Sequence, residues 1–226
     1  MIKTLRNKFH DLRNTGNDTR ASIELSRLGL EFTPWTKSAI RPAALLQLLN
    51  EILINDRRTV IEFGAGISTI YLAKVLSSVG GRLISFEDDA GWAGIVTQML
   101  HRHGLQDWVT SVVAPLGPCA NAPTGLEWYD EAAVRDALNG RTVDLALVDG
   151  PKAHHPASRL ARYPAYGVTS PFLAPRAAVA LDDITRKGER DVLDKWRALP
   201  GFDFDVSIAH SGIALLRRGP YFMTEM

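Results

Sequence analysis

Three aspartates in this sequence stand where carboxylate chemistry is expected. Asp149 directly follows the apolar stretch 143–148, and Asp182 and Asp183 follow the apolar stretch 177–181. Both stretches predict buried parallel strands, whose carboxyl ends meet at one edge of a sheet. Clustered carboxylates are the ligands that Mg²⁺ and Ca²⁺ prefer. The sequence predicts a divalent metal site of Asp149, Asp182 and Asp183; the alternative is that Asp149 contacts a cofactor or caps the next helix, while the pair begins a solvated loop.

Basic side chains after Asp149 offer acid–base alternatives. Lys152 lies three residues further on, and His154 and His155 follow it. Without a metal, Asp149, His154 or His155 is a candidate general base for an acceptor hydroxyl. A zinc site is not expected, because adjacent histidines seldom bind one ion and no Cys/His partner lies at zinc spacing.

The segment 154–173 carries further polar candidates. Arg159, Arg162 and Tyr163 could bind an acidic or sugar-like substrate, although surface ion pairing is the expected role of at least one arginine. The lone cysteine, Cys119, is paired with no base by any motif, so it is not expected to act as a nucleophile.

A glycine turn forms the second candidate site. The apolar stretch 59–63 predicts a strand, Gly64 and Gly66 allow a tight turn, and an apolar-periodic helix begins near Ser68. Backbone N–H groups at such a helix start can hold a nucleotide-like ligand. Glu87 ends the next predicted strand, 82–87, about 20 residues further on, where an acid that binds ribose is expected.

The turn departs from the dinucleotide pattern, since Thr69 stands where G-x-G-x-x-G requires a third glycine. Glu62-Phe-Gly-Ala-Gly66, with a second strand ending in Glu87, instead resembles the first two motifs of class I S-adenosylmethionine-dependent methyltransferases, over about residues 35–217. The resemblance implies that Glu62 positions the methionine part of the cofactor, that the turn passes beneath it, and that Glu87 holds the ribose. Three further cofactor contacts are expected: Ser68 at the turn, Asp88 after the second strand, and Ser38 in the segment before the first strand. Trp35 and Thr36 are further candidate neighbours of the cofactor; the alternative for Trp35 is that it only anchors that segment.

The aspartates add a resemblance to the catechol O-methyltransferase-like branch of that family. There, an aspartate after the fourth strand and an Asp-Asn or Asp-Asp pair after the fifth bind a divalent ion, and a lysine at the spacing of Lys152 acts as base. The sequence departs from that branch at Asp149-Gly-Pro151 and in having Asp183 where asparagine is commoner.

The pattern of apolar stretches predicts an α/β fold. Five β/α units followed by two closely spaced strands, 202–207 and 213–217, predict a Rossmann-like, mostly parallel seven-stranded sheet with helices on both faces and an antiparallel last strand. The expected organisation is one domain, 1–226, with a helical extension over 1–55 and a core over 56–218. Residues 1–20 predict a basic amphipathic helix that ends at residues 14–18. The helix is expected to pack on its own domain or on a second subunit of a homodimer; the alternative is that it meets a membrane or a partner.

Two elements before and inside the core bear on the site. A helix over 39–54 is expected to precede the first strand. The Pro/Gly-rich stretch 114–125 predicts a long loop, either a lid over the site or a disordered surface loop, with Trp128 and Tyr129 as candidate wall residues.

Composition excludes several classes of function. The 226 residues include 26 basic and 25 acidic side chains, so a net charge of +1 gives no global field for nucleic acid. No apolar run approaches the roughly 20 residues of a membrane span. One cysteine and no signal-like N-terminus predict a cytoplasmic protein.

The expected function is transfer of a methyl group from S-adenosylmethionine to the hydroxyl of a small-molecule or glycan-linked acceptor, with Mg²⁺ assisting if the aspartates bind metal. Asp149, Lys152 and His154 are the candidate catalytic residues. The alternatives are a nicotinamide-dependent oxidoreductase and a non-catalytic binding protein on the same fold.

Overall fold

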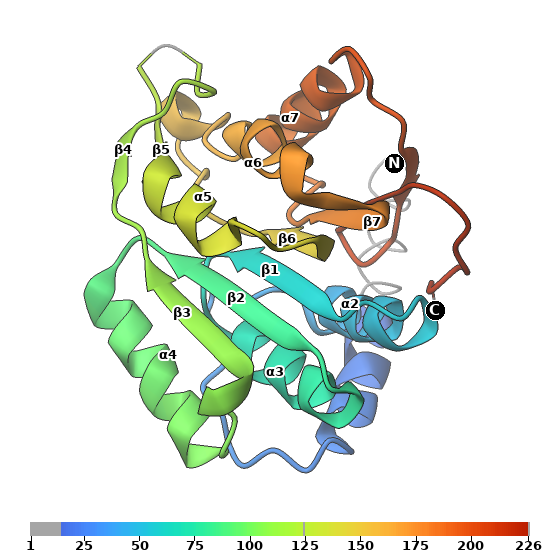
Figure 1. Cartoon of the computed structure of the whole chain (residues 1–226). Helices are drawn as coiled ribbons and strands as arrows, with labels where there is room; N and C mark the ends of the chain where they lie inside the picture. The colour runs from blue at the N-terminus through green and yellow to red at the C-terminus, as the bar shows by residue number, and fades with distance from the viewer. Residues whose placement is uncertain (1–14, 124, 226) are drawn as a thin grey trace, which may run out of the picture.

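The computed structural model describes residues 15–123 and 125–225, and its main sheet has seven strands in the order β3-β2-β1-β6-β7-β9-β8 (Figure 1). The first five in the chain, β1, β2, β3, β6 and β7, run parallel, and β9 is antiparallel to both β7 and β8. The predicted Rossmann-like sheet with an antiparallel last strand is therefore confirmed. The strands are β1 Thr59–Phe63, β2 Arg82–Glu87, β3 Val109–Val113, β6 Val143–Val148, β7 Leu173–Leu181, β8 Asp205–Ile208 and β9 Ala214–Arg217.

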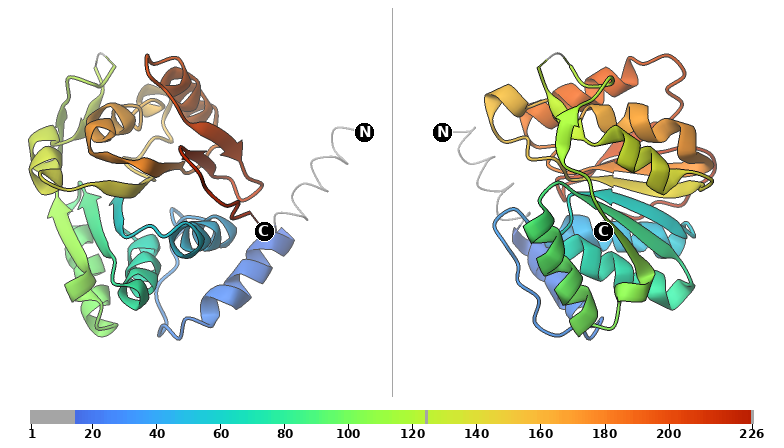
Figure 2. Two further views of the ribbon diagram at one scale, coloured as in Figure 1. Left: turned by 45° about the vertical axis from the view of Figure 1, so that its right-hand side comes forward. Right: turned by 60° about the vertical axis from the view of Figure 1, so that its left-hand side comes forward.

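Helices cover both faces of this sheet (Figures 1 and 2). Neighbouring side chains of a strand point to opposite faces, so Val60 packs with the core beneath α2 and α3, whereas Ile61 packs with the core beneath α5, α6 and α7. The helices are α2 Pro42–Ile54, α3 Ile67–Val79, α4 Ala90–Arg102, α5 Glu131–Leu138, α6 Pro164–Thr169 and α7 Lys187–Arg197, with short 3₁₀ turns η1 Gln106–Trp108, η2 Pro156–Ser158 and η3 Ser170–Phe172.

Helix starts follow from local chemistry. Pro42 opens α2, where a missing N–H costs nothing. Asp89 caps α4 by accepting a hydrogen bond from the Trp92 amide at 3.0 Å, as its position after β2 suggests. The Asp89 cap fixes where the loop after β2 turns into α4.

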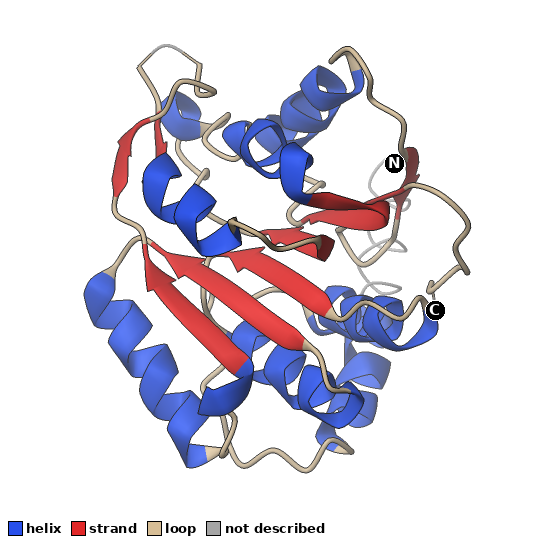
Figure 3. Cartoon of the chain, viewed as in Figure 1, coloured by secondary structure: helices blue, strands red, loops and turns tan. Residues whose placement is uncertain are grey.

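The stretch predicted as a long loop is partly ordered into a hairpin outside the main sheet (Figure 3). Strands β4 Leu116–Pro118 and β5 Glu127–Tyr129 pair antiparallel. Trp128 and Tyr129 are fully buried. Three-residue strands are too short to show a readable period in the sequence, which is why the hairpin is absent from the prediction.

The predicted end of the N-terminal helix at residues 14–18 is wrong, because residues 15–26 are helical. Asp18 accepts hydrogen bonds from Arg41 Nη2 at 2.8 Å and from the Ala43 amide at 3.2 Å, and these tertiary contacts stabilise helix through a polar stretch. The amphipathic prediction for residues 1–14 lies outside the described residues. No helix in the described ranges has the length and apolar character to span a membrane.

Candidate active site

A cavity of about 330 Å³ opens at the carboxyl ends of β1, β2 and β6. Its walls come from the segment before α2, the glycine turn after β1, the acidic turn after β2 and the loop after β6. This is where open α/β sheets bind ligands.

The glycine turn forms one wall because of two different properties of its glycines. Gly64 has a φ of +94°, and a Cβ there would lie 3.1 Å from the Gly150 amide nitrogen. At Gly66 the backbone is extended, and an added Cβ would meet no atom within 4 Å. Gly64 thus lets two loops approach each other, whereas Gly66 leaves space in the cavity wall.

Glu62 is fully buried and does not line the cavity. Its carboxylate accepts hydrogen bonds from the hydroxyls of Ser68 at 2.9 Å, Ser85 at 2.7 Å and Thr69. Burial raises the pKa of Glu62 from 4.5 to about 7, although these three hydrogen bonds oppose the rise. Within the described residues, Glu62 therefore ties α3 and β2 to the end of β1.

We expect Glu62→Gln to remove a pH dependence of stability. An acid whose pKa is raised on folding stabilises the folded state fully below its unfolded pKa of 4.5, and this contribution is lost as pH rises through about 7. The shift corresponds to about 3 kcal/mol. Urea unfolding of both proteins from pH 4.5 to 8 should show that the free energy of unfolding falls by about 3 kcal/mol more in the wild type than in Glu62→Gln. Parallel profiles would contradict the prediction.

The acidic turn after β2 forms a second wall of the cavity, next to the glycine turn. Glu87 accepts hydrogen bonds from the amides of Ala65 and Asp89, both at 3.0 Å, and it lines the cavity together with Asp88. Burial raises the pKa of Glu87, although these two hydrogen bonds oppose the rise. Trp92 closes this side by donating its indole N–H to the Ala65 carbonyl at 2.7 Å.

Three aspartates converge at the edge of the cavity, as predicted from the strand ends. Carboxylate oxygens of Asp149, Asp182 and Asp183 lie within 4.8 Å of one another, which defines a candidate metal site. Asp149 lines the cavity with Lys152, whereas Asp182 and Asp183 lie outside its lining. Burial and mutual repulsion raise the pKa of Asp149 well above its ordinary value and that of Asp182 to about 6.

A buried arginine already pairs with two of the three aspartates. Arg162 Nη2 lies 3.2 Å from Asp149 Oδ1 and 3.2 Å from Asp183 Oδ2. An ion about 2.1 Å from Asp149 Oδ1 would lie at most about 5 Å from Nη2, since both share that oxygen. The two cations would repel each other and compete for the same lone pairs. The residues present therefore do not fit a divalent ion while the guanidinium holds this position.

The cavity brings together most of the residues predicted to bind cofactor or acceptor. Its lining includes Ser38, Gly64, Gly66, Ser68, Glu87, Asp88, Asp149 and Lys152. His154 is exposed and does not line the cavity, and neither does Trp35, which packs edge-on against Tyr71. Met99 and Trp92 of α4 and Ile40, just before α2, line it without having been predicted, because the sequence does not show whether an apolar residue faces a ligand or a core.

The sequence matches one family model, described as a methyltransferase domain, over residues 61–184, more than half of the 226 residues. The chain belongs to this family and is a class I S-adenosylmethionine-dependent methyltransferase. The nicotinamide alternative is set aside accordingly. No curated protein matches the sequence significantly.

Solved structures share the fold at low sequence identity. A proposed caffeoyl-CoA O-methyltransferase from Staphylococcus aureus is 15% identical, covers 96% of this chain and 99% of its own, and gives a TM-score of 0.60. A Podospora anserina methyltransferase with bound S-adenosylhomocysteine is 12% identical, with 88% of each chain covered and a TM-score of 0.59. An O-methyltransferase from Bacillus cereus, in complex with S-adenosylhomocysteine, is 21% identical, with 90% and 91% covered and a TM-score of 0.53.

Proposed function

We propose that this enzyme transfers the methyl group of S-adenosylmethionine to a hydroxyl oxygen of a small-molecule acceptor. The observation that carries the proposal is one cavity whose lining includes the glycine turn, Glu87 and Asp149. Its volume of about 330 Å³ lies at the lower end of the range for small-ligand pockets. Two of the similar structures are described as O-methyltransferases, which agrees with this acceptor class.

The cofactor would lie along the glycine turn. In this arrangement Glu87 accepts hydrogen bonds from the ribose hydroxyls, Gly66 leaves room for the ligand, and Ser38, Ser68 and Asp88 surround it. The bound sulfonium supplies an activated methyl group. Glu62 acts indirectly, by holding Ser68 and Thr69 at the start of α3.

We expect Gly66→Ala to weaken S-adenosylhomocysteine binding by about 5- to 100-fold, because the added methyl group intrudes on the ligand's space. The fold should be unaffected, since an extended backbone accepts alanine and the Cβ meets no protein atom. Calorimetric titration and a melting curve measure the two effects. Gly64→Ala is the contrasting variant, with a lowered melting temperature, because alanine is strained at a φ of +94°. Unchanged affinity in Gly66→Ala would place the ligand elsewhere.

Tyr129 is the wall residue whose polar atom lacks a partner. Its side chain is fully buried and lines the cavity, and its hydroxyl has no hydrogen-bond partner in the described parts of the chain. A Cβ on Gly150 would overlap that hydroxyl. The hydroxyl is completely covered in this structure, between the cavity and Gly150. We propose that the wall opens when a ligand binds and that the ligand then supplies the missing hydrogen bond.

Tyr129→Phe should therefore weaken S-adenosylhomocysteine binding by about 2- to 10-fold, the effect of one hydrogen bond. The ligand-free protein should keep its melting temperature, because the variant removes only an unpaired buried hydroxyl. Tyr166→Phe removes the hydroxyl of another buried tyrosine that does not line the cavity. Equal affinity of both variants would show that Tyr129 does not contact the ligand.

The acceptor would lie next to Asp149 in the cavity. Methyl transfer requires the hydroxyl to be aligned behind the methyl group and to lose its proton. Asp149, whose side chain is 13% exposed, is the carboxylate that lines the cavity here and is our candidate base. Lys152, exposed on the same wall, is the second candidate.

Calorimetric titration of S-adenosylhomocysteine tests the cofactor assignment, and micromolar binding is expected. A screen of small alcohols and phenols for S-adenosylhomocysteine formation then tests the acceptor class. Absence of binding would overturn the proposal. Methylation of amines but of no hydroxyl compound would overturn its acceptor half.

A further inference from the structure

Asp149, the candidate base, is backed by a buried arginine that has no part in the proposal above. Arg162 lies between η2 and α6, and its side chain is 4% exposed. All three of its nitrogens donate to main-chain carbonyls: Nη2 to Asp149 at 2.7 Å, Nη1 to Asp182 at 3.3 Å and Nε to Pro151 at 3.4 Å. A planar guanidinium held at three points cannot swing away without breaking these bonds.

The same guanidinium is the shared counter-ion of the acidic cluster. Besides Asp149 and Asp183, each 3.2 Å from Nη2, it faces Glu189, whose Oε1 lies 3.7 Å from Nη1. Glu189 is buried, and its carboxylate has no hydrogen-bond partner in the described structure. Burial lowers the pKa of Arg162, but the surrounding carboxylates outweigh that effect and raise it, so the arginine stays charged.

A second cation completes the arrangement on the exposed side. Arg186 Nη1 lies 2.7 Å from Asp183 Oδ2 and 3.8 Å from Glu189 Oε1. Asp183 is thus bound by two guanidinium groups, and its φ of +59° is unusual for a residue other than glycine. Both arginines contact the same oxygen, Oδ2, which is therefore already neutralised by two positive charges.

We propose that Arg162 takes the place of a divalent ion at these strand ends, as a positioning residue that holds Asp149 against the cavity, and that methyl transfer here needs no divalent metal. The role in transfer rests on the proposed function. The charge arrangement does not, because it follows from the contacts of Arg162 alone.

Titration with Mn²⁺ alone, read as loss of the free-ion signal by electron paramagnetic resonance, tests the proposal without any acceptor. The wild type should bind no Mn²⁺ at the cluster below millimolar concentration. Arg162→Met, which keeps the length and removes the charge, should bind Mn²⁺ at least about tenfold more tightly, because the competing cation is gone. Adding Asp183→Asn to that variant should abolish the gain.

Arg159→Met is the matched control. Arg159 is half-exposed, and its Nε lies 3.9 Å from Asp191, outside the cluster. The control loses the same charge and should bind Mn²⁺ no better than the wild type. A gain equal to that of Arg162→Met would make the effect one of net charge and would overturn the proposal.

The wild-type protein decides the question even if Arg162→Met fails to fold. Micromolar Mn²⁺ binding that Asp183→Asn abolishes would overturn the proposal. No Mn²⁺ binding, together with methyl transfer undiminished by exhaustive chelation, would support it. Failure of S-adenosylhomocysteine to bind would count against the proposed function and leave the Mn²⁺ result intact.

Discussion

Asp149→Asn is expected to lower kcat by about 10²- to 10⁴-fold, the usual contribution of a positioned general base. Asparagine keeps the size of the side chain and an oxygen for Arg162 but cannot accept the proton of an acceptor hydroxyl. The melting temperature should change little, because burial and Asp182 disfavour the charged form of this carboxylate and Arg162 keeps Asp183 and Glu189 as counter-ions. The rate of S-adenosylhomocysteine formation, with the acceptor that the screen selects, measures the effect.

Binding of the cofactor separates this loss from general damage. S-adenosylhomocysteine affinity of Asp149→Asn should stay near the wild-type value, since Glu87 and the glycine turn are untouched. Lys152→Met is the paired variant, and a loss of less than about tenfold is expected because that side chain is exposed. A larger loss of kcat in Lys152→Met than in Asp149→Asn would identify Lys152, and not Asp149, as the general base.

The strands and the cofactor end of the cavity were predictable because both follow from local rules. A short apolar stretch placed β2 at residues 82–87, where the structure has it. Once the strands are parallel, topology alone brings Gly64, Glu87 and Asp149 to one edge. The convergence of Asp149, Asp182 and Asp183 followed from the same reasoning.

The arginine that pairs with that cluster was not predictable in its role. Arg162 and Arg159 stand three residues apart in a segment without a clear period, and one is buried while the other is half-exposed. Only the three-dimensional path of the chain between η2 and α6 decides which of them meets the aspartates. A metal site inferred from the ligands alone omitted the competing cation for this reason.

Contacts between distant segments were also invisible. The polar stretch 14–18 predicts a helix end, yet Arg41 stabilises helix there from 23 residues away. Glu51, in the middle of an apolar helix, gave no sign of its partners, which lie in the β1 approach and near the C-terminus. Helix and strand periods encode which face is buried, but not which charged residues meet across the fold.

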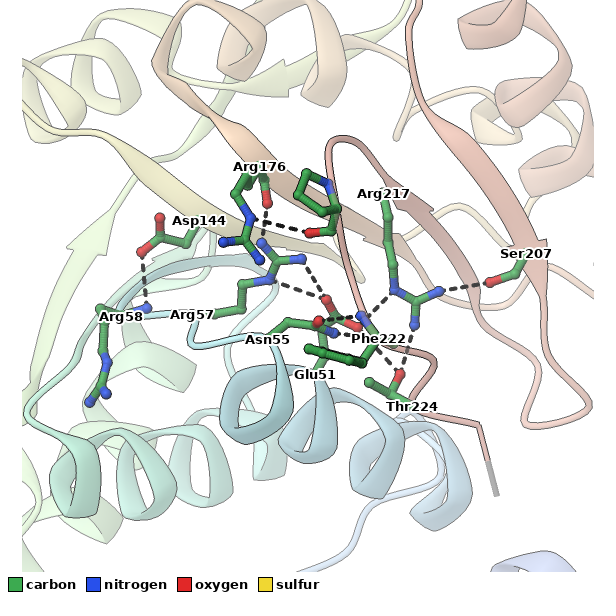
Figure 4. Close-up of polar contacts among 11 residues, drawn as sticks. Glu51, Asn55, Arg57, Arg58, Asp144, Arg176, Ser207, Arg217, Phe222 and Thr224 are labelled. Carbon is green, nitrogen blue, oxygen red and sulfur yellow. Dashed lines mark hydrogen bonds and ion pairs between the residues drawn. The ribbon is translucent and has the colours of Figure 1, made fainter.

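The pairing of Glu51 is the strongest test of what holds the N-terminal helices to the sheet. Its buried carboxylate lies between two buried arginines, 2.8 Å from Arg57 Nη2 and 2.8 Å from Arg217 Nε (Figure 4). Thr224 adds the C-terminal segment by accepting from Arg217 Nη2 at 2.7 Å and donating to Glu51 at 3.3 Å. One carboxylate therefore joins α2 to β9 and to the end of the chain.

Glu51→Gln is expected to lower the free energy of unfolding by about 3–5 kcal/mol, because it leaves two buried guanidinium groups without a counter-charge. Glu24→Gln is the matched control. It breaks an ion pair of the same length, 2.8 Å to Arg27, but with 71% and 38% of the two side chains exposed, and should cost at most about 1 kcal/mol. Denaturant unfolding measures both. If the two variants lose equal stability, burial does not set the strength of these pairs. A larger loss in Glu51→Gln with unchanged S-adenosylhomocysteine affinity would instead make the pair a structural anchor of α2, separate from the cavity at the other end of that helix.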